Sequence, residues 1–223
     1  MSNPPQLLND DGSASIATAF MTSHFAFRRD LARFAAALSG PAMNASTAQA
    51  LADEWQTFHT HLHSHHQAED NGVFPTFRTE HTQLEAVIAR LSADHRLIDP
   101  LLERADRAFA ELDKGPAHPL AVIGELQGLL GPHLALEEAE LIPFLRGVKD
   151  FPPPPDDATA DLYAEGFAWS TQGIASEVIE QLDALLPEIL RGRLPAARAD
   201  FRARCDRVWG TLPVSAARTP IPE

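Results

Sequence analysis

The sequence predicts an all-α protein, an antiparallel four-helix bundle with a C-terminal helical extension. Apolar residues recur at helical spacing along most of the first 150 residues or so, and no segment alternates between apolar and polar residues as a strand does. The connections between these segments are short or contain glycine and proline, as in SGPAMN and DKGPAHP. Short connections of this kind are typical of antiparallel neighbouring helices.

Four helices are expected in the first part of the chain, each with one apolar stripe for a common core. They span residues 14–39, 45–72, 83–113 and 118–146. Ser46 or Thr47 is the expected N-cap of the second helix. The third helix contains Pro100, which should kink or locally break it because proline lacks the N–H that a helix needs.

The proline run DFPPPPDD at 150–157 ends the helical region, since consecutive prolines favour an extended conformation. The predicted domains are a bundle at 1–149, a linker at 150–157 and an extension at 158–223. The extension, with helices expected over 158–186 and 195–209, is too small for a strong core of its own. We expect it to pack on the bundle or on a second subunit. Trp169 and the leucine-rich segment 174–190 would suit the interface of a homodimer.

The composition limits the partners and the compartment. The 223 residues carry a formal net charge of −13, which argues against nucleic acid or an anionic membrane as a partner. Cys205 is the only cysteine, so an intramolecular disulfide is impossible. The start, MSNPPQLLND, lacks the features of a signal peptide, and no apolar run approaches the ~18 residues of a membrane span. We expect a soluble, cytoplasmic protein.

The segment HTHLHSHHQAEDNGVFP at 59–75 points to a metal, because histidine is the commonest metal ligand near neutral pH. Since an α-helix advances about 100° per residue, the direction of each side chain can be worked out. His65 and Glu69 fall in or beside the apolar stripe of their helix, and His61 falls at its edge. Three histidines of this segment are expected to face solvent: His59, His63 and His66.

The same test places one histidine on the core face of every other helix of the bundle. These histidines are His24, His95 and His133. Glu137 follows His133 by four positions, which repeats the spacing found in the second helix. A buried carboxylate is costly unless it is paired or bound to a metal, and residues four apart share one helix face. Imidazole nitrogen with carboxylate oxygen suits iron, manganese or zinc.

An internal repeat supports a metal site. HHQAEDNGVFPTF (65–77) aligns without gaps with HLALEEAELIPFL (133–145), and HFAFRRDL (24–31) aligns with HRLIDPLL (95–102). The chain therefore consists of two related helix hairpins, each of which provides one His and one His-x-x-x-Glu. This arrangement predicts a pseudo-twofold site with one metal in each half.

The repeated order His … His-x-x-x-Glu-acid-x-x-apolar-apolar-Pro resembles the hemerythrin-like (HHE cation-binding) domain over about residues 14–147. The resemblance implies an antiparallel four-helix bundle around a non-haem di-iron centre with bridging carboxylates. It also implies binding or sensing of oxygen, or handling of reactive oxygen, nitric oxide or iron. Two iron ions are the expected cofactor, with manganese or zinc as alternatives. The implied ligands, with both glutamates as bridges, are His24, His65, Glu69, His95, His133 and Glu137.

The third helix departs from this family pattern. Oxygen-carrying hemerythrins have His-x-x-x-His there, whereas this sequence has Asp99 at the second position. Either Asp99 is a ligand, or His61, one turn before His65, takes the place of the missing histidine. Harder oxygen ligands favour the ferric state, so redox sensing, or peroxide or nitric oxide chemistry, gains over reversible oxygen carriage.

Three functions stay open at this point. The favoured one is a binding protein whose partner is dioxygen or another small oxidant, and the second is an enzyme in which the same centre decomposes peroxide or oxidises a substrate. The third is an interaction protein that a metal stabilises. The first two are separated by turnover: an enzyme would consume oxygen, peroxide or nitric oxide beyond one stoichiometric event, and a binding protein would not. A ferritin-like oxidase is set aside because no histidine has an acid three residues before it.

Overall fold

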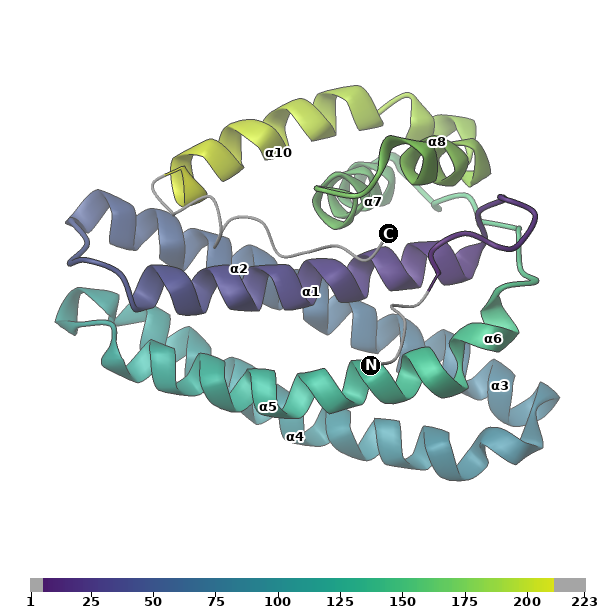
Figure 1. Ribbon diagram of the computed structural model, residues 1–223, viewed down its shortest axis with the longest axis horizontal. Helices are drawn as coiled ribbons and strands as arrows, with labels where there is room; N and C mark the ends of the chain where they lie inside the picture. The colour runs from purple at the N-terminus through teal and green to yellow at the C-terminus, as the bar shows by residue number, and fades with distance from the viewer. Residues whose placement is uncertain (1–5, 211–223) are drawn as a thin grey trace. The chain divides into compact units, whose positions relative to one another are not determined.

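The protein is all-α, as the sequence predicts. The computed structural model describes residues 6–210, and within that range all regular structure is helical, with no strand. The last residues of the predicted extension, 211–223, lie outside the described part. The helices, labelled in Figure 1, are α1 (Ile16–Leu38), α2 (Ala45–Ala68), η1 (Glu69–Val73), α3 (Phe74–Glu80), η2 (Thr82–Leu84), α4 (Glu85–Ala110), η3 (Leu112–Lys114), α5 (Ala117–Glu140), α6 (Ile142–Leu145), α7 (Asp157–Ser170), α8 (Ser176–Leu185), α9 (Glu188–Arg191) and α10 (Leu194–Trp209).

The chain divides into two compact units. The central unit is Asp30–Glu140, and the flanking unit combines the residues up to Arg29 with those from Leu141 onward. Helix α1 begins in the flanking unit and ends in the central unit. In the central unit, α4 lies against both α2 and α5, and Figure 1 shows α4 and α5 running along each other.

The core of the central unit holds a cluster of four fully buried aromatic rings. They are Phe34, Trp55, Phe58 and Phe109, from the end of α1, from α2 and from α4. Trp55 stacks on Phe109 with ring centroids 4.8 Å apart, and its Nε1 donates to Asp106 at 2.7 Å. Each buried ring stabilises the fold by about 1.5–3 kcal/mol. The cluster therefore fixes the register of three helices.

Helix α2 starts and ends at points that local chemistry explains. Its N-cap is Asn44, whose side chain accepts from the backbone N–H of Thr47, so the prediction of Ser46 or Thr47 as the cap is wrong. The α-helix ends at Ala68, earlier than predicted, and continues as the π-helical turn η1. Pro75 follows this turn. In a regular α-helix its ring would clash with the carbonyl four residues earlier, which a wider turn avoids.

Helix α4 continues through Pro100 without a break. Of the two sequence-based alternatives, a kink or a local break, the unbroken helix excludes the break. Pro100 is exposed, so water can reach the backbone carbonyl that its missing N–H leaves without a helical partner. Packing on both sides of α4 thus outweighs the unfavourable proline.

In the flanking unit the C-terminal helices share a core with each other and with the first residues of α1. Phe27 of α1 packs on Trp169 of α7 with centroids 5.0 Å apart, and the Arg29 guanidinium donates to the Trp169 carbonyl at 3.1 Å. The leucines of the predicted dimer segment are buried in the same unit, in a cluster that includes Leu182, Leu186, Leu190 and Leu194. Dimer formation stays a prediction, and these leucines are already buried within one chain.

No helix among residues 6–210 is long and apolar enough to cross a membrane.

Candidate metal centre

The end of α2 and the turn η1 carry the first set of polar side chains into the interior of the central unit. Glu69 follows His65 by four positions and His66 by three, so both rings lie one helical turn before the carboxylate. Glu69 is fully buried, and it is the first residue of the π-helical turn. π-Helical turns inside α-helices occur frequently at functional sites.

The two oxygens of Glu69 face different partners. Oε1 lies 3.0 Å from Nε2 of His65, and Oε2 lies 3.4 Å from Nε2 of His95 on α4. Both partners present a ring nitrogen, and both belong to the central unit. The carboxylate therefore lies between two imidazoles with one oxygen turned toward each of them.

Helix α5 supplies the second His-x-x-x-Glu pair. Nε2 of His133 lies 3.4 Å from Oε1 of Glu137, and both residues are about 1% exposed. On its other side, Nδ1 of His133 lies 3.7 Å from an oxygen of Asp94. The arrangement repeats that of Glu69, as the internal repeat predicts: the ring faces the glutamate through Nε2.

The donor atoms form two groups that share Glu69. In the first group, one atom each from His66, Glu69, His95 and His133 lies within 4.8 Å of every other. In the second, one atom each from His65, Glu69 and Glu137 meets the same limit. Separations of this size are those that a metal ion between the donors would span, since its bonds to nitrogen and oxygen are about 2 Å long.

A contact outside these groups orients His95. Its Nδ1 lies 2.9 Å from Oδ2 of Asp70. An ionised carboxylate can only accept, so Nδ1 carries a proton, and Nε2, which faces Glu69, is the ring nitrogen left to bind a metal. The ring is also held between two others, stacked on His66 at 4.0 Å and on Phe74 at 5.6 Å. Carboxylates that hold ligand histidines in this way are typical of metal sites.

Burial and neighbouring charged or polar groups shift the pKa values of three residues of the site in opposite directions. Burial acts to raise the pKa of Glu69, but the facing rings of His65 and His95 outweigh it and keep the pKa well below its usual value. Burial acts to lower the pKa of His95, but the carboxylates of Glu69 and Asp70, which face its two ring nitrogens, raise it overall. Burial, with His95 alongside, lowers the pKa of His66 to about 2. His66 is therefore a neutral imidazole with a lone pair available.

A metal cation fits these residues. Both ring nitrogens of His66 are buried and have no hydrogen-bond partner among residues 6–210. Two glutamate side chains, Glu69 and Glu137, are buried in the same region. A buried polar atom without a partner costs about 1–3 kcal/mol, and a buried carboxylate costs more unless it is paired or bound to a metal. A cation would satisfy the nitrogens and the carboxylates together.

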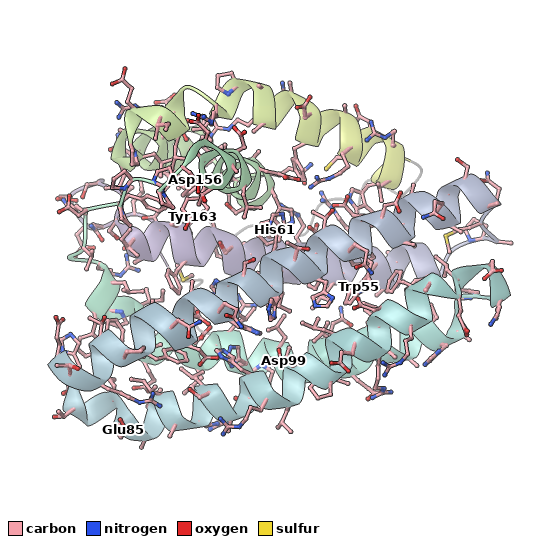
Figure 2. All side chains as sticks on the ribbon, turned by 180° about the vertical axis from the view of Figure 1, so that it is seen from behind. Trp55, His61, Glu85, Asp99, Asp156 and Tyr163 are labelled. Carbon is pink, nitrogen blue, oxygen red and sulfur yellow. The ribbon has the colours of Figure 1, made fainter. Side chains whose placement is uncertain are left out.

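Five of the six predicted ligands lie in these groups: His65, Glu69, His95, His133 and Glu137. The sixth, His24, is buried on α1 in the flanking unit, beside the ring of Phe20, and its role as a ligand stays a prediction. Asp99 is exposed on α4 and His61 is half-buried on α2; both are labelled in Figure 2. Neither belongs to the donor groups found among the described residues.

Three further histidines of the motif were expected to face solvent. His63 does so, and His59 is partly exposed with its Nδ1 at 2.9 Å from Asp106. The prediction for His66 is wrong, because its residue is only 3% exposed and lies in the first donor group. The available signal was its repeat partner Leu134, which marks this register as a core position.

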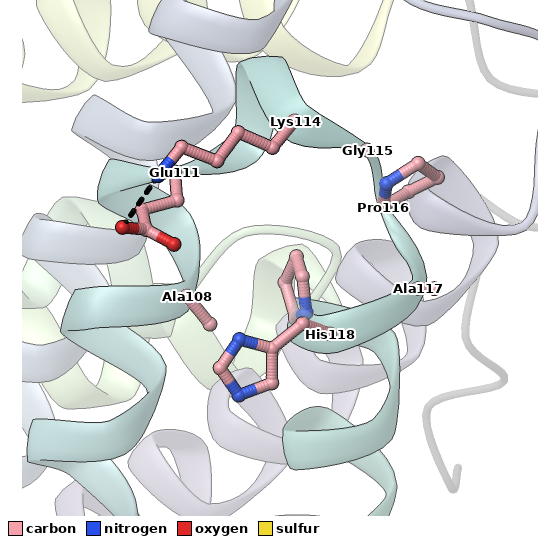
Figure 3. A pocket seen from close by; sticks show the side chains of 8 residues that line it. Ala108, Glu111, Lys114, Gly115, Pro116, Ala117 and His118 are labelled. Atoms are coloured by element: carbon pink, nitrogen blue, oxygen red, sulfur yellow. Dashed lines mark ion pairs between the residues drawn. The ribbon is translucent and has the colours of Figure 1, made fainter.

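A separate pocket of about 240 Å³ lies where η3 leads into α5. It is lined by the Glu111–Lys114 ion pair, 2.8 Å long, and by the exposed ring of His118, as Figure 3 shows. None of its lining residues contributes to the donor groups. The donor groups and this pocket are therefore separate features of the central unit.

Comparison with known proteins agrees with this geometry. Residues 15–145 match the family model described as the hemerythrin HHE cation-binding domain. No curated protein and no solved structure matches the chain. The family match covers more than half of the chain and includes every residue of both donor groups. The chain belongs to the hemerythrin HHE cation-binding family, whose domain binds metal cations.

Proposed function

We propose that the protein is a non-haem di-iron protein that binds or senses oxygen or a related small species such as peroxide or nitric oxide. The observation that carries this proposal is the position of Glu69, which has one oxygen turned toward His65 and the other toward His95. A carboxylate shared by two donor groups is suited to bridge two metal ions. A single ion would need only one of these groups.

The proposed ligands are His24, His65, Glu69, His95, His133 and Glu137. The first group of donors supports one metal position, and the second group supports the other. His24 joins the set because it takes the place in the first half of the internal repeat that His95 takes in the second half. We propose an antiparallel four-helix bundle as the scaffold that brings these residues together.

Bound iron would supply a redox-active Lewis acid able to take up a small oxidant. The protein residues prepare this position. Asp70 holds the Nδ1 proton of His95, so that Nε2 stays free to donate. Burial excludes water and keeps the carboxylates of Glu69 and Glu137 for the metal. A site this enclosed admits small diatomic species or peroxide more readily than a bulky organic substrate, which favours binding or sensing.

Iron binding by matched histidine variants tests the proposal. We expect the purified protein, given ferrous iron without oxygen, to bind two equivalents by elemental analysis, and His65→Ala to lose stoichiometric binding. His63→Ala is the control, since this histidine lies two positions away on the same helix and is exposed. Equal loss of iron in both variants would contradict the proposal, as would full binding in His65→Ala.

The response to oxidants then separates binding from catalysis. The visible absorption of the loaded protein is recorded before and after reduction, and again after oxygen, peroxide or nitric oxide is added. One stoichiometric spectral change supports a binding or sensing protein. Continued consumption of peroxide would instead assign the centre to an enzyme, and a spectrum that does not respond would assign the metal a stabilising role.

A further inference from the structure

His66 is the one histidine of the donor groups that has no counterpart in the internal repeat. The aligned position in the second half is Leu134, which is fully buried. The fold therefore accepts an aliphatic side chain at this register, and nothing in the packing of a helix core requires an imidazole there. A polar ring at a core position needs a chemical reason.

The surroundings of His66 supply donors and no hydrogen-bond partner. Its ring stacks on His95 at 4.0 Å and meets His133 edge-on at 5.5 Å. Neither of its nitrogens forms a hydrogen bond within residues 6–210, although the ring is almost completely buried. Stacking alone does not explain the residue, because an apolar ring would stack without leaving two polar atoms unsatisfied.

We propose that His66 is a metal ligand, and that it makes the two metal positions chemically unequal. This inference rests on the proposed function. One position would have three imidazoles, from His66, His95 and His133, together with a Glu69 oxygen. The other would have His65, the Glu137 carboxylate and the second Glu69 oxygen, together with His24 of the proposed ligand set. The missing histidine of α4 is thus replaced from α2, at a position different from either of the sequence-based alternatives, Asp99 and His61.

The inequality has a chemical consequence. Three neutral imidazoles bring less negative charge to a metal than carboxylates do, so they stabilise the lower oxidation state relative to an oxygen-rich set. The position that contains His66 should therefore hold ferrous iron longer during oxidation. A centre with one readily oxidised and one resistant iron passes through a mixed-valence state, which has an unpaired electron that can be observed.

His66→Leu tests the proposal, because it introduces the residue that the second half of the repeat carries at the same register. In anaerobic titrations with ferrous iron, we expect one equivalent to bind as in the wild type and the second to bind on the order of 100-fold more weakly. The metal-free variant should be at least as stable as the metal-free wild type, since an unsatisfied polar ring has been removed. His63→Leu, the same change at an exposed position, should leave both equivalents in place.

His66→Gln provides a second test in case the leucine variant does not fold. It keeps a polar side chain of similar reach but removes the imidazole, and it too should weaken one equivalent. In partly oxidised wild type we expect a mixed-valence electron paramagnetic resonance signal that both His66 variants alter and His63→Leu does not. Two full equivalents and an unchanged signal in the His66 variants would overturn the proposal. A wild type that binds no stoichiometric iron would instead refute the proposed function itself.

Discussion

At the residue scale, Asp70 determines which ring nitrogen of His95 faces the metal site. The 2.9 Å contact between Oδ2 of Asp70 and Nδ1 of His95 fixes the tautomer of the ring. An amide in place of the carboxylate can turn its NH₂ group toward Nδ1, which would move the proton to Nε2 and block the donor. We expect Asp70→Asn to weaken iron binding about 10- to 100-fold without changing the number of ions bound at saturation. Competition with a chelator of known affinity measures this loss.

Asp99→Asn is the matched control, because it makes the same change at an exposed residue one turn after His95 on α4. Iron affinity should stay at the wild-type value, since Asp99 lies outside both donor groups. The pair also tests the sequence-based alternative that Asp99 is a ligand. An Asp99→Asn variant that loses iron while Asp70→Asn keeps it would show that the orienting role has been given to the wrong aspartate.

At the element scale, both halves of the repeat interrupt a helix between the glutamate and the following proline. In the first half the interruption is the π-helical turn η1, in which the Phe74 N–H bonds to the Glu69 carbonyl. In the second half α5 ends at Glu140, and the short α6 begins at Ile142. Pro75 and Pro143 lack the N–H of a regular helix and explain both interruptions. The proline therefore belongs to the motif for a structural reason.

Pro100 shows how far packing can override a helix breaker. An interior proline costs a helix about 3 kcal/mol, partly offset by about 0.4–1 kcal/mol because proline also restricts the unfolded chain. Since α4 is unbroken and Pro100 is exposed, we expect Pro100→Ala to raise the free energy of unfolding by about 1–3 kcal/mol. Urea denaturation of the chelated protein measures the change.

Leu97→Ala, at another exposed position of α4, serves as the control and should stay within about 0.5 kcal/mol of the wild type. A Pro100→Ala variant that is less stable than the wild type would mean that Pro100 is itself required for the packing of α4 on α2 and α5. In that case the iron affinity would also be expected to fall, since α4 carries His95.

At the scale of the whole molecule, helical periodicity predicts which side chains of each single helix point into the core. The pairs His65–Glu69 and His133–Glu137 follow from the spacing, because His133 and Glu137 lie on one regular helix and the π-helical turn η1 begins only at Glu69. The sequence predicts His66 to face solvent, because the periodicity of one straight helix says nothing of the rings of α4 and α5 that cover this side chain. The division into two units was not foreseen either, since its boundary falls inside α1, where the composition does not change.

The folded state should depend on the bound metal, because the buried donors converge only when the chain is folded. A ligand that binds only the folded state at 100 to 1,000 times its Kd adds about 3–4 kcal/mol to the free energy of unfolding. We therefore expect chelation to lower the melting temperature of the loaded wild type, and the melting temperature to rise again as iron is titrated back.

In Glu69→Gln the loaded and chelated forms should melt at similar temperatures, since the shared carboxylate is gone. His63→Ala should keep the full difference, because its ring lies in solvent. A wild type that melts at one temperature with and without iron would mean that these buried carboxylates are neutralised by their own histidines, and that no metal is needed to keep them in the core.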